Sequence, residues 1–180
     1  MNFPDFNSFN NGFRLNENEE YVYTPDNLVP TTEFITKDKY IQGFESMIDK
    51  ISYTFLFIID TGTLTIEMKL NQPTDNVNDQ DSTFIYKIFS TINDILNKYV
   101  KPKAIKIGDV DIISIQIKPA IDLSNKAIEL AKRNRIYDNM MKSVIFNDSV
   151  EYKLSYDDND LIFKIINEIG DKSSLKISEL

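Results

Sequence analysis

The chain has 180 residues, a net charge of −8 at pH 7, and neither Cys nor His. A hydrophobic content of 42% fits one globular domain with extensions, and the lack of Cys and His excludes disulfides, thiolate metal sites and the commonest zinc ligand and general base. The negative charge argues against a nucleic-acid binder, and the apolar runs are too short to cross a bilayer.

The first thirteen residues carry four of the chain's twelve Phe residues. Between them lie Asn, Ser, Pro, Asp and Gly, which favour turns and extended chain over helix, and the early Pro and Asp do not fit a signal peptide. A polyproline-like path would bring every third residue to one face. The pattern predicts an extended arm over residues 1–35 that inserts its rings into apolar pockets of another protein. The predicted partner-binding residues are Phe3, Phe6, Phe9, Phe13, Tyr21 and Tyr23.

The predicted globular domain begins at residue 36 with a helix and a hairpin. Thr36 is a candidate N-cap, and apolar residues from Tyr40 to Ile51 recur at helical spacing. The next run, ISYTFLFIID, is apolar on both faces and predicts a central strand. TLTIEMKL then alternates strictly, which predicts a hairpin about Asp60-Thr61-Gly62 with one solvated face.

Two more helices and two more hairpins are predicted downstream. Asp81 or Ser82 caps a helix with a broad apolar stripe that we expect to end before Pro102. A second hairpin is predicted about Gly108-Asp109, and a third helix from Asp122 or Ser124 to Met141. A third hairpin surrounds residues 157–160, while residues 161–169 fit a strand or a short helix equally well.

These elements predict an α+β fold, with three amphipathic helices on one face of a mainly antiparallel sheet of hairpins and an extended N-terminal arm. The predicted organisation is an arm at 1–35, a single domain at 36–170 and a C-terminal tail at 171–180.

The segment FIIDTGT resembles the active-site triplet of retropepsin-like aspartic proteases, and Ile105 to Gly108 resembles that family's second hydrophobic segment. The resemblance implies a homodimer in which two Asp60 carboxylates share one proton and activate water. A hairpin turn explains the same residues, and five Gly are few for that family's glycine-rich flaps. The protease therefore remains an alternative interpretation.

Two acidic clusters, at residues 75–81 and 157–160, raise the possibility of calcium. Read as an EF-hand loop from Asp79, the first cluster has Phe84 where the loop needs Gly and Ser90 where it needs Glu. We expect both clusters to be solvated loops, and we predict no metal site, no cofactor and no catalytic residue.

We therefore expect a non-catalytic structural or assembly subunit of a large protein complex. Its expected partners are other subunits, with copies of itself among the candidates. Abundant Ile, Asn and Lys beside three Arg and four Ala is typical of AT-rich genomes. This composition favours a phage or viral particle component at a neck, tail or capsid-accessory position, assembled in the host cytoplasm and located in the virion. The alternatives are the homodimeric aspartic protease and an acidic cytoplasmic regulator that binds a partner protein.

Overall fold

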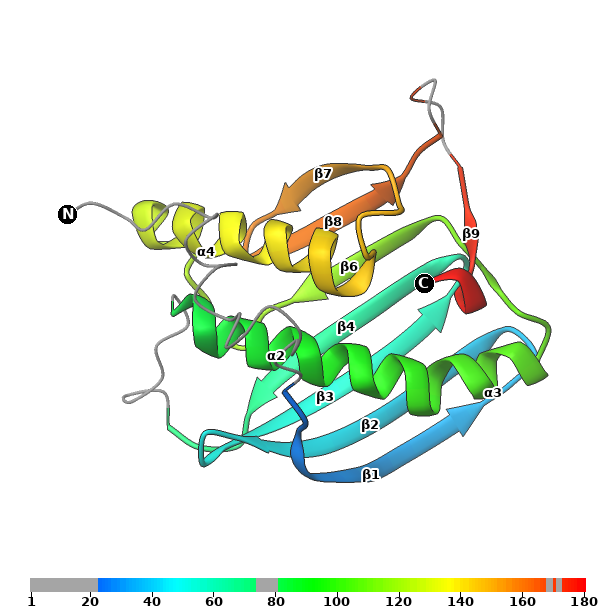
Figure 1. Ribbon diagram of the computed structural model, residues 1–180, viewed down its shortest axis with the longest axis horizontal. Coiled ribbons are helices and arrows are strands. Elements are labelled where there is room, and N and C mark those ends of the chain that lie inside the picture. Colours follow the sequence, from blue (N-terminus) through cyan, green and yellow to red (C-terminus); the bar gives the residue numbers. More distant parts are fainter. Residues whose placement is uncertain (1–22, 74–80, 168–169, 171–172) are drawn as a thin grey trace, which may run out of the picture.

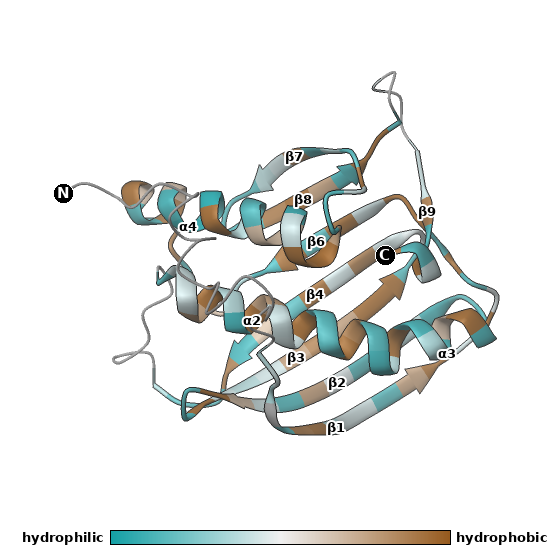
Figure 2. Cartoon of the chain, in the orientation of Figure 1, coloured by the Kyte–Doolittle hydropathy of each residue, from teal (hydrophilic) through white to brown (hydrophobic). Residues whose placement is uncertain are grey.

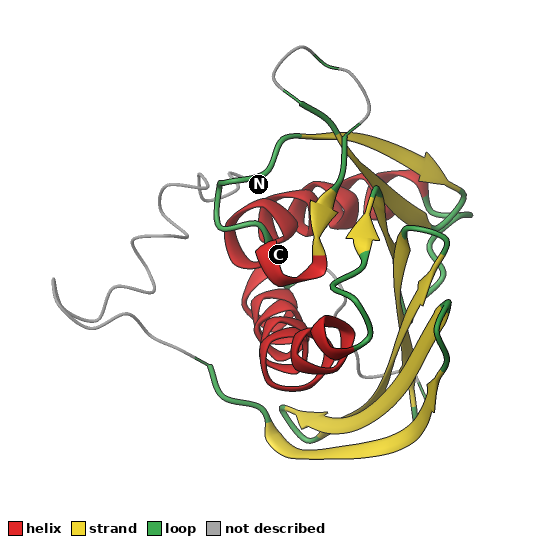
Figure 3. Ribbon diagram, turned by 90° about the vertical axis from the view of Figure 1, so that its right-hand side faces the viewer, coloured by secondary structure: helices red, strands yellow, loops and turns green. Residues whose placement is uncertain are grey.

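The computed structural model describes residues 23–73, 81–167, 170 and 173–180. Within them, seven strands form one sheet in the order β1-β2-β3-β4-β6-β8-β7, and two helical segments lie on the same side of it (Figures 1 and 3). The sheet strands are β1 (Asp26–Ile35), β2 (Lys39–Ile48), β3 (Ile51–Asp60), β4 (Thr63–Leu70), β6 (Ser114–Lys118), β7 (Tyr152–Asp157) and β8 (Asp160–Ile165). The short strands β5 (Asp111–Ile112) and β9 (Leu175–Lys176) form a separate pair.

Apart from a single 3-10 turn at Ile177–Glu179, the described residues contain two helical segments, so the prediction of three amphipathic helices is wrong. The structure is consistent with the coarser α+β class. The first segment joins α2 (Ser82–Ile95), a π-helical turn (Leu96–Val100) and α3 (Lys101–Lys106). The second joins α4 (Ala127–Met140) to a π-helical turn (Met141–Ile145). None of these helices is long and apolar enough to cross a membrane.

Residues 36–51, predicted to be helical, form β2, its turns and the first residue of β3 instead. Tyr40, Phe44 and Ile48 are buried on the face toward the helices. Gln42 and Ser46 lie on the same face, and because they are polar they interrupt the apolar–polar alternation that would predict a strand. Ile41 and Met47 add apolar residues on the opposite face, so the sequence mimics a helical period. The ten-residue pairing of β2 with β3 stabilises the strand.

The edge strand β1 occupies residues 26–35, which were assigned to the arm in the sequence analysis. A Cβ on Gly43 of β2 would lie 2.6 Å from Thr31 Oγ1, so this glycine allows β1 to approach closely. The β1–β2 pairing slips between Asp26 and Val29 and again between Pro30 and Glu33. These irregularities and the proline make β1 a poor template for a further strand.

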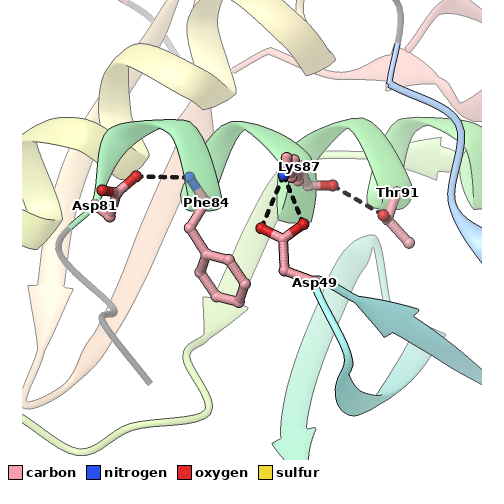
Figure 4. A network of polar contacts seen from close by, with 5 residues as sticks. All are labelled: Asp49, Asp81, Phe84, Lys87 and Thr91. Carbon is pink, nitrogen blue, oxygen red and sulfur yellow. Dashed lines mark hydrogen bonds and ion pairs between the residues drawn. The ribbon is translucent and has the colours of Figure 1, made fainter. Parts of the chain in front are cut away.

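Helix α2 confirms the predicted amphipathic stripe, and hydrophobic and hydrophilic residues alternate along it in Figure 2. Asp81 caps its N-terminus by accepting a hydrogen bond from the Phe84 backbone N–H at 3.0 Å (Figure 4). The predicted end before Pro102 is wrong, because the helical segment continues through this proline, which lies in the first turn of α3 directly after the π-helical turn.

The predicted hairpin about Gly108-Asp109 is also wrong. Residues 104–106 are helical, so β6 follows a helical connection from β4 and pairs parallel to it. The third predicted hairpin is confirmed as β7–β8, and residues 160–165 are strand rather than helix.

The C-terminal residues 173–180, predicted as part of a tail, pack against the domain. Ile177 is fully buried, β9 pairs with β5, and the Lys101 ammonium donates to the Leu180 carbonyl. The hydrophobic core lies between the sheet and the helical segments and includes Ile177.

Candidate interaction surface

Of the six predicted partner-binding residues, Phe3, Phe6, Phe9, Phe13 and Tyr21 lie outside the described residues. Tyr23 is described and half-buried. The Lys87 ammonium on α2 lies 5.7 Å from the centre of the Tyr23 ring, within cation–π range. The described chain therefore begins on the helix side of the sheet.

Lys87 also connects α2 to the turn between β2 and β3. Its ammonium lies 2.6 Å and 2.8 Å from the two carboxylate oxygens of Asp49, as Figure 4 shows. Asp49 and Lys50 both have positive φ, 49° and 68°, as a two-residue hairpin turn of type I′ requires. The ion pair thus holds a backbone turn that non-glycine residues adopt only at a cost.

Asp60, the candidate protease residue, flanks a hairpin turn at the end of β3. Thr61 and Gly62 adopt positive φ, 47° and 78°, and Asp60 pairs with Thr63. The Asp60 carboxylate lies 3.4 Å from the Lys39 ammonium. The segment beginning at Ile105 ends a helix rather than forming a strand. The two parts of the protease resemblance therefore lie in a turn and at a helix end.

The acidic turn between β7 and β8 joins a hydrogen-bonded network through Asn159. Asn159 accepts from the Leu123 N–H at 2.9 Å and donates to the Ile121 carbonyl at 3.2 Å. Arg133, fully buried on α4, donates to the carbonyls of Ile121 and Asn159 at 2.7 Å and 2.9 Å. The network joins α4, the loop before it and the turn.

Neither acidic cluster forms a metal site within the described residues. Among the described residues, no group of three or more Asp or Glu side chains is arranged to hold a metal ion. Residues 75–80 of the other cluster lie outside the described residues.

Tyr40, which is buried, and Tyr152, which is half-buried, carry phenols with raised pKa values. Burial raises the pKa of Tyr40 far above its usual range, and the nearby Glu33 carboxylate adds to the effect. The Tyr40 hydroxyl donates to the Gln42 side-chain oxygen. Burial also raises the pKa of Tyr152, whose hydroxyl donates to Asp138 at 2.6 Å. Both phenols are therefore neutral hydrogen-bond donors at physiological pH, as in a structural role.

The face of the sheet opposite the helical segments is the strongest candidate for a functional surface. We call it the outer face; no described helix covers it (Figure 3). One row of side chains crosses all seven strands in register on this face. Its members are Phe34, Ile41, Ile58, Thr65, Gln116, Ile162 and Ser155.

The part of the outer face over β1, β2 and β3 carries a group of apolar residues, with the exposed Glu45 of β2 opposite Val29. Phe34 and Val29 on the edge strand are 53% and 52% exposed, and Ile41, Leu56 and Ile58 are half-buried beside them. We call these five residues the apolar patch. A single exposed apolar side chain is ordinary, whereas a contiguous group on a strand surface is typical of an interaction site.

The part over β6, β8 and β7 is polar and carries charges of both signs, since Asp157 and Asp160 stand opposite each other on β7 and β8. Lys153 on β7 and Lys164 on β8 stand directly opposite each other, and both are exposed. We call them the lysine pair. Like charges opposite each other destabilise a sheet by up to about 1 kcal/mol. A lysine on an edge strand prevents aggregation, but Lys164 lies on an interior strand, so edge protection does not explain it.

The sequence does not predict the outer face, because the residues of its first two strands fit an extended arm and a helix. No short-range pattern reveals this face, because Ile41, Gly43, Glu45 and Met47 share it on β2 and mix apolar, small and charged residues.

Comparison of the chain with known protein families, with curated proteins and with solved structures found no match.

Proposed function

We propose that the protein is a non-catalytic structural or assembly subunit that joins a larger protein complex, with its Phe-rich N-terminal segment as the docking element. The observation that carries this proposal is the apolar patch on the outer face, where Phe34 and Val29 are about half exposed. A surface of this kind is stabilised when a partner covers it. The four Phe residues at positions 3–13 supply a second apolar surface in the same chain.

The more specific form of the proposal is a component of a phage or viral particle. Its support is compositional: Ile, Asn and Lys are abundant, while Arg occurs three times and Ala four times. Such a chain would be assembled in the host cytoplasm and carried in the virion.

The test is sedimentation of the full-length chain in lysates of its native source. The wild-type chain should sediment with a particle much larger than one chain. A variant with Phe3, Phe6, Phe9 and Phe13 replaced by Ser should remain at the top of the gradient with an unchanged melting temperature. The matched control replaces Asn2, Asn7, Asn10 and Asn11 of the same segment by Ser and should sediment like wild type.

Two results would count against the proposal. One is a wild-type chain that sediments only as a free chain. The other is a Phe-to-Ser variant that still enters the particle in wild-type amounts.

A further inference from the structure

We infer that the outer face of the sheet is the docking site for the N-terminal segment, residues 1–22, of a second copy of the chain. The inference rests on the proposed function, since it names the surface that receives the docking element.

The apolar patch matches the aromatic part of this segment. Phe34, Ile41 and Ile58 are direct cross-strand neighbours, so their side chains form a continuous strip across β1, β2 and β3. Adjacent strands are about 4.8 Å apart, which places β1 and β3 about 10 Å apart. Rings three residues apart on a polyproline path lie about 9 Å apart. Two successive Phe rings can therefore contact the two ends of the strip together.

The lysine pair matches the acidic part of the same segment. Residues 1–22 contain four carboxylates, three of them at Glu17, Glu19 and Glu20, against one guanidinium, a net charge of −3. In the described residues the ammonium groups of Lys153 and Lys164 form no ion pair with a carboxylate. An acidic ligand would relieve the repulsion between these two cations.

The two matches agree in spacing as well as in chemistry. β2 and β8 are four strand positions apart in the sheet, or about 19 Å. Ten residues separate Phe9 from Glu19, and ten residues of extended chain reach about 33 Å. A segment lying across the strands can thus place Phe rings on the apolar patch and carboxylates on the lysine pair at once.

The start of the described chain favours a segment from a second copy. The Tyr23 ring lies by the Lys87 ammonium on α2, so the described chain begins on the helix side of its own sheet. To reach its own outer face, the segment would have to pass around an edge of the sheet. The segment of a second copy can reach the outer face without passing around the edge of its own sheet. A reciprocal exchange between two chains buries both segments.

The first experiment measures association of full-length chains by sedimentation equilibrium. One variant replaces Phe3, Phe6 and Phe9 by Ser. A second replaces Phe34 by Ser and Ile58 by Thr, which keeps good strand formers on β3. Wild type should associate beyond the monomer, and each variant should weaken association by at least about tenfold, since one buried Phe contributes about 1.5–3 kcal/mol.

Mixing the two variants tests whether the contact is between copies. The segment-variant chain keeps an intact outer face, and the face-variant chain keeps an intact segment, so their equimolar mixture should form a heterodimer. The control is Ile128→Ser on α4, an 87% exposed apolar residue away from the outer face, which should associate like wild type.

A charge-exchange experiment tests the lysine pair. Lys153→Glu with Lys164→Glu should weaken association roughly two- to fivefold, as should Glu19→Lys with Glu20→Lys. A mixture of the two charge variants should associate more tightly than either alone. Lys142→Glu, an exposed change on the π-helical turn after α4, is the matched control and should leave association unchanged.

The outcomes separate the inference from the proposed function. If the segment variant dissociates while the face variant still associates, the receiving surface is elsewhere and only the inference fails. Failure of the mixture to form a heterodimer, or a monomeric wild type at all concentrations, also overturns the inference. If the segment variant still assembles into its native particle, the proposed function fails with it.

Discussion

Arg133→Ala should be one of the most destabilising single changes in the chain. Arg133 is 0% exposed, and its guanidinium connects α4 to the Ile121 and Asn159 carbonyls at 2.7 Å and 2.9 Å. It also lies 5.5 Å from the centre of the Tyr137 ring. Truncation therefore removes contacts between three separate parts of the fold.

The expected loss follows from these contacts. Hydrogen bonds that involve a charged group contribute about 1.5–3 kcal/mol each, so the two bonds to carbonyls account for about 3–6 kcal/mol. Relief of the cation's desolvation offsets part of this loss. We expect a decrease of about 3–5 kcal/mol in the free energy of unfolding, or roughly 6–20 °C in melting temperature for a chain of this length.

The assay is urea denaturation of the full-length variants, followed by far-UV circular dichroism and by tyrosine fluorescence, which is usable because the chain has nine Tyr and no Trp. The matched control is Arg135→Ala, an exposed change on the same helix that should stay within about 0.5 kcal/mol of wild type. Hydrogen exchange at the Leu123 amide, which donates to Asn159, should accelerate in Arg133→Ala alone. If the two variants differ by less than about 1 kcal/mol, the network does not stabilise the fold as argued.

Four further predictions concern the core, the turns and alkaline pH. Ile88→Ala and Ile92→Ala should each cost about 2–5 kcal/mol in urea denaturation, because both side chains are at most 1% exposed in the core; a cost below 1 kcal/mol would contradict this. Lys50→Gly should raise the free energy of unfolding by about 0.5–1 kcal/mol, because Lys50 has φ 68° and Gly adopts positive φ without strain. A variant that is less stable than wild type would refute the assignment of strain to this turn. Asp60→Asn should change stability by less than about 1 kcal/mol, because its ion pair is solvent-exposed, and wild-type peptide cleavage that this change abolishes would support the protease instead. Burial raises the pKa of Tyr40 in the folded state above its unfolded value, so the contribution of the neutral phenol to stability is complete below pH 10 and is lost as the pH rises above 10. In alkaline denaturation, Tyr40→Phe should therefore lose less stability between pH 9 and 11 than wild type, and an equal loss would contradict this assignment.

Several elements could be predicted from the sequence because one short-range pattern dominates each of them. Thr63–Leu70 alternates strictly and forms β4, and the Thr61–Gly62 turn before it has the positive φ values that its residues favour. The stripe of α2 is apolar along its whole length, and its residues from Phe84 to Ile95 are buried as expected.

The β2 strand could not be predicted because its two faces are chemically mixed. Gln42 and Ser46 are buried on the core face, where the Gln42 side chain accepts from Tyr40, and apolar Ile41 lies on the outer face. Only the pairing with β1 and β3 decides between helix and strand for such a segment, because strand hydrogen bonds join residues distant in sequence.

Contacts between residues distant in sequence also decide the helix through Pro102, the parallel pairing of β4 with β6, and the outer face. The π-helical turn before α3 lets the helix continue through Pro102, which no local rule foresees. The sequence by itself determined the α+β class, the aromatic N-terminal segment and the acidic charge. Tertiary structure alone decided that Phe34, Ile41 and Ile58 become neighbours and that Lys153 faces Lys164, because strand register sets which side chains share a face.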